Sequence, residues 1–217
     1  MIKNDYPMKS LSVFAIISAF FLTGFYSSPN YISLFDGKTF NGWQGDTLNT
    51  WHIENGTLIG GSMDKMVPQN DFLCTKRSYA NYILKLKVKL TGSKGFINSG
   101  IQFRSQRLTN PANEMKGYQA DWGEGYWGTL YDESRRNRTI AGIDPKLTQK
   151  KVKLNNWNDY EIRAENRRIR LYINGYKTVD YTEPDAEIPQ EGLIGFQLHG
   201  GGITQVAFKD IFLKKLP

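Results

Sequence analysis

The sequence has very little cysteine and histidine and no long run of basic residues. Cys74 is the only cysteine, so an internal disulfide is excluded, and no CxxC or Cys/His cluster is present to hold a structural zinc. The formal net charge is +7, but nowhere do five or six basic residues follow one another. We therefore expect no nucleic acid partner, and an adaptor for anionic surfaces would need a basic patch that no run of residues indicates. Stability must come from packing.

Long hydrophobic runs are also missing, except near the N-terminus. Lys3 and Lys9 precede an apolar run over residues 11–25, which is followed by the polar letters SSPN. This pattern predicts a secretory signal peptide over residues 1–30, an exported (periplasmic or secreted) protein, and one domain over residues 31–217. The run is shorter than the roughly 20 residues of a membrane-spanning helix, so we expect no integral membrane domain after signal removal, with an uncleaved anchor as the alternative. Phe25 stands where a lipoprotein would carry its lipidated cysteine.

From residue 31 onward the chain consists of short segments of β type separated by turn residues. The segment 82–90 alternates apolar and polar residues, as a half-buried strand does. Asn55-Gly56 and Asn174-Gly175 each lie between two such segments, and Asn-Gly is the strongest short signal of a tight hairpin. We therefore predict an all-β sandwich of roughly ten or more strands in two antiparallel sheets.

Three of the predicted strands carry unusual polar residues on the side away from the core. Because side chains alternate along a strand, the apolar residues of segments 98–104, 117–122 and 193–199 fix which side faces the core. The opposite side then carries amide, charged or imidazole groups: Asn98, Gln102, Arg104, Gln119, Asp121, Gln197 and His199. A solvated face would be an alternative explanation for any single strand. Amides, carboxylates and arginine at fixed geometry nevertheless favour a hydroxyl-rich ligand.

Further site candidates lie in or beside the loop that follows residue 122. Its aromatic residues could stack on a sugar ring, although packing is an equal alternative for each of them: Trp122, Tyr126, Trp127 and Tyr131. Glu133 and Arg136 are candidates because they lie close to these aromatics in sequence. His199 is the better of the two histidines for proton transfer, since Gln197 lies on the same side of its strand.

Eight short motifs occur in an order that resembles the 3-keto-disaccharide hydrolase family. They are LFDGKTFNGW (34–43), WHIENGTLIG (51–60), NSGIQFR (98–104), GYQADWGEGYWGTLYDESRR (117–136), WNDYEI (157–162), YINGYKTVDY (172–181), GLIGFQLHG (192–200) and VAFKDIFLKKL (206–216). The resemblance implies a concanavalin A-like jelly roll. It also implies an enzyme that cleaves glycosidic bonds of 3-keto-glucosides or 3-keto-disaccharides as a 3-keto-glucoside 1,2-lyase and 2-hydroxy-3-keto-glucal hydratase. The sum of the two steps is hydrolysis.

On this resemblance, a ketone at C3 makes the proton on C2 acidic, and three roles must be filled. Asp121 or His199 would be the base, the other would assist the leaving group, and Arg104, with Asn98 or Gln119, would stabilise the C3 oxygen. The remaining residues would bind the sugar: Asn98, Gln102, Gln119, Gln197, Trp122, Trp127, Tyr131, Glu133 and Arg136. A divalent metal held by Asp121, Glu124 or His199 stays open, and no ligand spacing supports one. An upstream sugar oxidoreductase would supply the keto sugar.

Two other functions fit part of this pattern. A non-catalytic carbohydrate-binding module would use the same polar face and loop aromatics. An ordinary glucanase is the weaker enzymatic alternative, because the polar face supplies only Asp121 as a secure carboxylate and the Glu-x-Asp-x-x-Glu strand of jelly-roll glucanases is absent.

Overall fold

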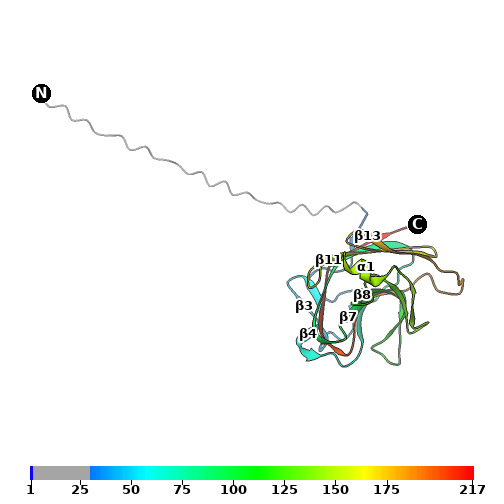
Figure 1. Ribbon diagram of the computed structural model, residues 1–217, viewed down its shortest axis with the longest axis horizontal. Helices are drawn as coiled ribbons and strands as arrows, with labels where there is room; N and C mark the ends of the chain where they lie inside the picture. Colours follow the sequence, from blue (N-terminus) through cyan, green and yellow to red (C-terminus); the bar gives the residue numbers. More distant parts are fainter. Residues whose placement is uncertain (2–29) are drawn as a thin grey trace.

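The computed structural model describes residue 1 and residues 30–217, and the described chain folds into two stacked antiparallel sheets (Figure 1). The predicted signal peptide therefore lies almost entirely outside the described residues. In spatial order, sheet A consists of β13 (Tyr176–Thr182), β12 (Arg168–Ile173), β11 (Asn158–Glu165), β6 (Tyr82–Gly95), β15 (Gly202–Lys215), β4 (Thr57–Met66) and β3 (Trp51–Glu54), with β1 (Ile32–Ser33) paired to β15. Sheet B consists of β10 (Arg138–Ala141), β9 (Leu130–Glu133), β8 (Met115–Gly123), β7 (Asn98–Arg107), β14 (Leu193–Leu198), β5 (Asp71–Thr75) and β2 (Trp43–Gln44).

The predicted all-β sandwich is confirmed, including both Asn-Gly hairpins. Asn55 and Gly56 have φ of 47° and 73° between β3 and β4, and Asn174 and Gly175 have φ of 48° and 80° between β12 and β13. Two successive positive φ values match the right-handed twist of the flanking strands, and Asn and Gly tolerate them best. The short helix α1 (Pro145–Gln149) is the single α-helix of the described chain, and no described helix has the length and hydropathy to cross a bilayer.

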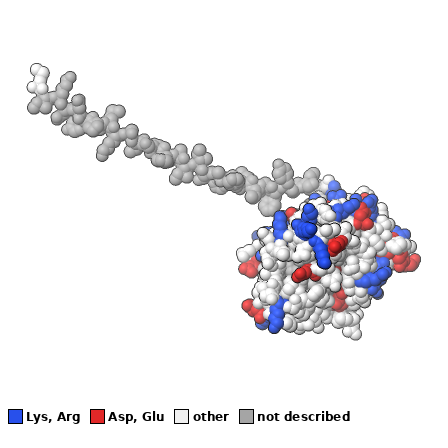
Figure 2. All heavy atoms as spheres, in the orientation of Figure 1, with Lys and Arg blue, Asp and Glu red and all other residues white. Residues whose placement is uncertain are grey.

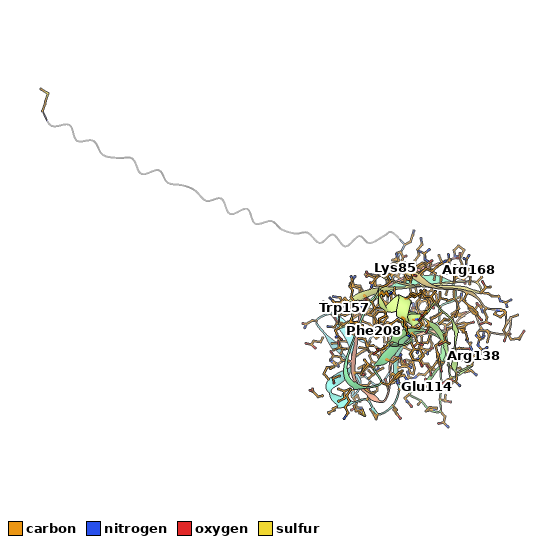
Figure 3. The ribbon with its side chains drawn as sticks, viewed as in Figure 1. Lys85, Glu114, Arg138, Trp157, Arg168 and Phe208 are labelled. Carbon is orange, nitrogen blue, oxygen red and sulfur yellow. The ribbon has the colours of Figure 1, made fainter. Side chains whose placement is uncertain are left out.

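The core lies between the sheets and is built from the apolar half of each alternating strand. Phe196 on β14 stacks on Phe208 of β15 at 4.1 Å between ring centroids, and this contact joins sheet B to sheet A (Phe208 is labelled in Figure 3). The predicted core residues of the three polar strands, among them Ile101, Ala120 and Leu198, are all fully or almost fully buried. Their polar neighbours therefore lie on the outer face of sheet B.

Sheet topology makes β8, β7 and β14 adjacent, which the sequence left open. Gly100 pairs with Asp121 on one side and with Gln197 on the other, and Gln102 pairs with Gln119. A Cβ atom on Gly100 would lie 2.5 Å from Cδ of Gln119. The glycine thus leaves the space in which the Gln119 side chain lies across β7.

Candidate functional site

A pocket of about 130 Å³ opens on the outer face of sheet B. Strands β7, β8 and β9, the end of β14 and two loops contribute its lining residues: Phe96, Asn98, Gln119, Asp121, Tyr126, Tyr131, Glu133 and His199. The lining contains two carboxyl groups, one imidazole, two amides and three aromatic rings. Six of these residues, including Asp121 and His199, were predicted from alternation or loop position as site candidates, and Glu133, a candidate because it lies close to the aromatics in sequence, joins them.

A chain of side-chain amides runs beneath the pocket and connects its two carboxyl groups. Gln102 donates from Nε2 to Oε1 of Gln119 at 2.9 Å, and Gln119 donates from Nε2 to Oδ1 of Asp121 at 3.0 Å. Gln119 Nε2 also lies 3.3 Å from Oε1 of Gln197, whose own Nε2 lies 3.5 Å from Oε2 of Glu133. Gln102 and Gln197 thus support the site from below, since each orients a neighbour in the pocket lining.

Asp121 is 3% exposed, and burial raises the pKa of its carboxyl group well above the ordinary value. The negative charge of Glu133 raises this pKa further, while the hydrogen bond from Gln119 opposes the rise. A raised pKa extends to higher pH the range in which a carboxyl group holds its proton. Asp121 is therefore equipped to donate a proton.

Glu133 reaches the pocket because β9 alternates. Its neighbour Asp132 is fully buried on the other side of the strand, where it pairs with Arg135 at 2.8 Å and also with Arg136. Burial, followed by the charge of Glu114, raises the pKa of Glu133 to about 7. This carboxyl group changes its charge close to neutral pH.

The raised pKa of Glu133 predicts a stability gain for Glu133→Gln that depends on pH. Below the ordinary pKa of 4.5 both folded and unfolded chains hold the proton, so the carboxyl costs nothing. Above pH 7 the folded chain must hold a charge in a partly buried place, and removing that charge should stabilise it by on the order of 2 kcal/mol. Thermal melts at pH 4 and pH 8 measure the difference. Glu124→Gln, at an exposed position, serves as the control, and equal gains at both pH values would contradict the assignment.

His199 lies at the end of β14 with its ring fixed on one side. Nδ1 lies 2.6 Å from the carbonyl oxygen of Gly200, which can only accept, so the proton of the neutral ring is on Nδ1. Nε2 then carries the lone pair and is the nitrogen that can take up a proton. The ring of Phe96 packs edge-on against the imidazole at 4.7 Å between centroids.

Arg104 does not join this site. Its φ is +48°, and it lies in a bulge of β7 that interrupts pairing with β8 between Phe103 and Gln106. Its guanidinium donates instead to the carbonyl oxygens of Ala80 and Asn166 and to the side chains of Asn81 and Gln190, at 2.5 to 3.0 Å. The bulge breaks the period of two on which the prediction rested, so Arg104 connects loops of the framework rather than facing the sugar pocket.

Three further predicted sugar-binding residues also lie elsewhere. Trp122 and Trp127 are 1% and 5% exposed and pack against each other inside the core, with ring centroids 4.8 Å apart. Arg136 pairs with Asp132 and, at 2.7 Å, with the buried Glu183. Of the four aromatic residues predicted to stack on the sugar, only Tyr126 and Tyr131 line the pocket.

Sequence patterns missed Phe96 and Glu114. Phe96 is 41% exposed at the pocket and packs edge-on against Tyr126 at 6.1 Å between centroids. An exposed aromatic in the turn between two strands was the available signal. Glu114 lies on the side of the molecule opposite Lys85 (Figure 3) and acts on the site through its charge on Glu133. Within residue 1 and residues 30–217, no group of three metal-ligating side chains occurs, so Asp121, Glu124 and His199 do not form a ready metal centre.

A larger hollow, of about 580 Å³, lies on the outer face of sheet A and is a different kind of surface. Its charged groups pair with each other, as in Lys85 with Glu161 at 3.3 Å and Lys87 with Asp159 at 2.6 Å. Basic and acidic side chains are interspersed on the face that Figure 2 shows. Paired, exposed charges are typical of a solvated sheet face.

The family model and a curated relative indicate the same family. The family described as "3-keto-alpha-glucoside-1,2-lyase-like domain" matches residues 30–214. A protein of Bacteroides thetaiotaomicron named 3-keto-disaccharide hydrolase is 38% identical over 90 residues, which are 38% of this chain. That match spans 30% of the Bacteroides protein, less than a third of its length.

Solved structures with this fold include both enzymes and binding modules. A protein of Parabacteroides distasonis provisionally described as a glycosyl hydrolase has a TM-score of 0.65 at 20% identity, over 87% of this chain and 94% of that one. The carbohydrate-binding module CBM66 of Bacillus subtilis has a TM-score of 0.61 at 16% identity, over 80% and 96%. The β-glucanase of Bacillus licheniformis has a TM-score of 0.55 at 12% identity, over 86% and 97%. At these identities the likeness establishes the jelly-roll fold alone, and the chemistry has to be inferred from the residues of the site.

Proposed function

We propose that this chain, which belongs to the family of 3-keto-alpha-glucoside-1,2-lyase-like domains, is a carbohydrate-cleaving enzyme that splits 3-keto-glycosides by elimination and then hydrates the product. One observation carries the proposal. A carboxyl group whose pKa is raised by burial (Asp121) and an imidazole nitrogen with a free lone pair (on His199) line the same small pocket. One group can give a proton while the other takes one.

In the first step, Nε2 of His199 removes the C2 proton, and the electron pair moves toward the C3 carbonyl oxygen. The amide of Asn98, which also lines the pocket, stabilises the negative charge there in place of Arg104, because both N–H groups of Gln119 are already donated to Asp121 and Gln197. The charge returns to form the C1=C2 double bond, the C1–O bond breaks, and Asp121 protonates the departing oxygen.

In the second step, water adds to the unsaturated keto sugar with the same two groups in reversed roles. Asp121, now a carboxylate, takes a proton from water as its oxygen bonds to C1. The imidazolium of His199 returns a proton to C2. Both groups regain their starting protonation states, and the sum of the two steps is hydrolysis.

The pocket also limits how much of the substrate it encloses. Its volume is below the 300–1,000 Å³ typical of sites that bury a drug-sized ligand, so it holds one sugar ring and leaves the departing group outside. The exposed ring of Phe96, next to Tyr126, is where that group would lie. A substrate oxidised at C3 requires a sugar oxidoreductase upstream.

The direct test compares a 3-keto-glucoside with the unoxidised glucoside that carries the same leaving group. We expect aglycone release from the keto form alone, with a transient enone absorbance, because only the ketone makes the C2 proton acidic. Equal cleavage of the unoxidised form would instead favour the glycosidase alternative, to which the Asp121–Glu133 pair would then contribute. Saturable sugar binding without cleavage of either would establish a binding module.

A further inference from the structure

The loop between β4 and β5 holds both peptide groups that flank Gly200. Asn70 accepts the backbone N–H of Gly200 on its Oδ1 at 3.0 Å, and the carbonyl oxygen of Val67 accepts the N–H of Gly201 at 2.8 Å. A Cβ atom on Gly200 would lie 2.7 Å from the backbone of Gln69, so the two loops approach as closely as a glycine allows. The two loops are therefore in direct backbone contact at Gly200.

The two contacts fix successive peptide groups: Asn70 holds the His199–Gly200 peptide, and Val67 holds the Gly200–Gly201 peptide, which carries the Gly200 carbonyl. In a trans peptide the C=O of Gly200 and the N–H of Gly201 point in opposite directions. With that N–H directed at Val67, the carbonyl is directed away from the loop, and its oxygen lies 2.6 Å from Nδ1 of His199. The carbonyl is an acceptor only, so it selects the Nδ1–H tautomer.

Asn70 is itself clamped by the segment just before β8. Its carbonyl oxygen accepts from Nδ2 of Asn113 at 2.6 Å, and its own Nδ2 donates to Oε2 of Glu114 at 3.3 Å. These contacts use the Oδ1, the Nδ2 and the backbone carbonyl oxygen of Asn70, and together they connect the segment before β8 to Gly200. No motif of the sequence connects residues 70, 113 and 199.

We propose that Asn70 is a positioning residue: it fixes the His199–Gly200 peptide, next to the Gly200–Gly201 peptide that Val67 orients, and thereby holds His199 in the Nδ1–H tautomer, with the lone pair of Nε2 toward the pocket. The geometric part stands without the proposed function. Its catalytic consequence rests on the proposed function, because only there does Nε2 act as the base.

The chain has two histidines, so the tautomer of His199 can be measured directly by NMR with little overlap. We would label the full-length protein with ¹⁵N-histidine and record two-bond ¹H–¹⁵N spectra at pH 8.5, with His52→Gln assigning the remaining ring as His199. Wild type should show the Nδ1–H tautomer. In Asn70→Ala the ratio of tautomers should shift by at least fivefold toward Nε2–H, the form that an unconstrained imidazole prefers.

Two further variants keep the test decisive. Asn113→Ala removes the hydrogen bond to the Asn70 carbonyl oxygen and leaves the contact between Asn70 and Gly200 in place. It should shift the ratio of tautomers in the same direction by a smaller factor. This variant provides the test if Asn70→Ala does not fold. Gln69→Ala, at an exposed neighbouring position, should leave the ratio unchanged. An unchanged tautomer in Asn70→Ala, or in Asn113→Ala if the first does not fold, would overturn the proposal.

Kinetics with a 3-keto-glucoside separate the proposal from the proposed function. If both hold, Asn70→Ala lowers kcat about 10-fold with KM within twofold, in line with a misplaced base. A shifted tautomer with unchanged kcat would support the positioning role and contradict His199 as the base.

Discussion

His199→Gln is expected to lower kcat/KM for 3-keto-glycosides by about 10³-fold, within the range that a positioned acid or base contributes. Glutamine approximates the size of the ring and its hydrogen bonding, but it cannot take up the C2 proton. Because proton removal precedes departure of the aglycone, the loss should be similar for a methyl and a para-nitrophenyl leaving group. Initial rates of the two keto substrates measure it.

The matched control is His52→Gln, since His52 is exposed on β3 at a distance from the pocket lining. It should keep wild-type rates. Comparable melting temperatures for the two variants would show that the loss at His199 is chemical. A His199→Gln enzyme within tenfold of wild type on either substrate would be incompatible with the proposed base, and Glu133 would then take its place as the next candidate.

Much of the fold follows from local sequence signals. Asn55-Gly56 and Asn174-Gly175 determine two hairpins by backbone conformation alone. Strict alternation in β6, β8 and β14 assigns each side chain to the core or to the outer face without knowledge of the neighbouring strands. The same rule placed Gln119, Asp121 and Gln197 on one face.

The rule failed where the backbone departs from an even period. Arg104 continues the alternation of Gln102 in the sequence, but its positive φ lies in a bulge that turns the side chain toward loop carbonyls. Trp122 obeyed the alternation and is in the core for that reason. Trp122 was predicted to bind sugar because it lies next to the loop aromatics in sequence. The alternation of the strand, which assigns it to the core, gave the correct position.

The polar contacts that complete the site join residues far apart in the chain. Asn70 and Glu114 meet through a hydrogen bond across 44 positions, and Glu133 meets Gln197 across 64. Such pairs depend on which strands become neighbours in the sheet, and a single sequence does not contain that order. The raised pKa of Glu133 is likewise a product of burial in the assembled pocket.

Asp121→Asn should show a loss that depends on the leaving group, unlike His199→Gln. Burial raises the pKa of this carboxyl group, and its role as acid matters most when the departing oxygen is a poor leaving group. We expect about a 10³-fold loss of kcat/KM for a methyl 3-keto-glucoside. For the para-nitrophenyl derivative, whose phenolate leaves without a proton, we expect about tenfold or less.

The pH dependence of the wild-type enzyme is a second test of Asp121 as the acid. A raised pKa means that Asp121 donates its proton below that pKa and loses the ability as pH rises through it. The alkaline decline of activity should therefore be steep for the methyl substrate and weak for the para-nitrophenyl one. Asp64→Asn, at an exposed position on β4, should change neither profile. If Asp121→Asn slowed both substrates equally, Asp121 would act before the aglycone leaves, at C2 or at the C3 oxygen, and the roles of the two groups would have to be exchanged.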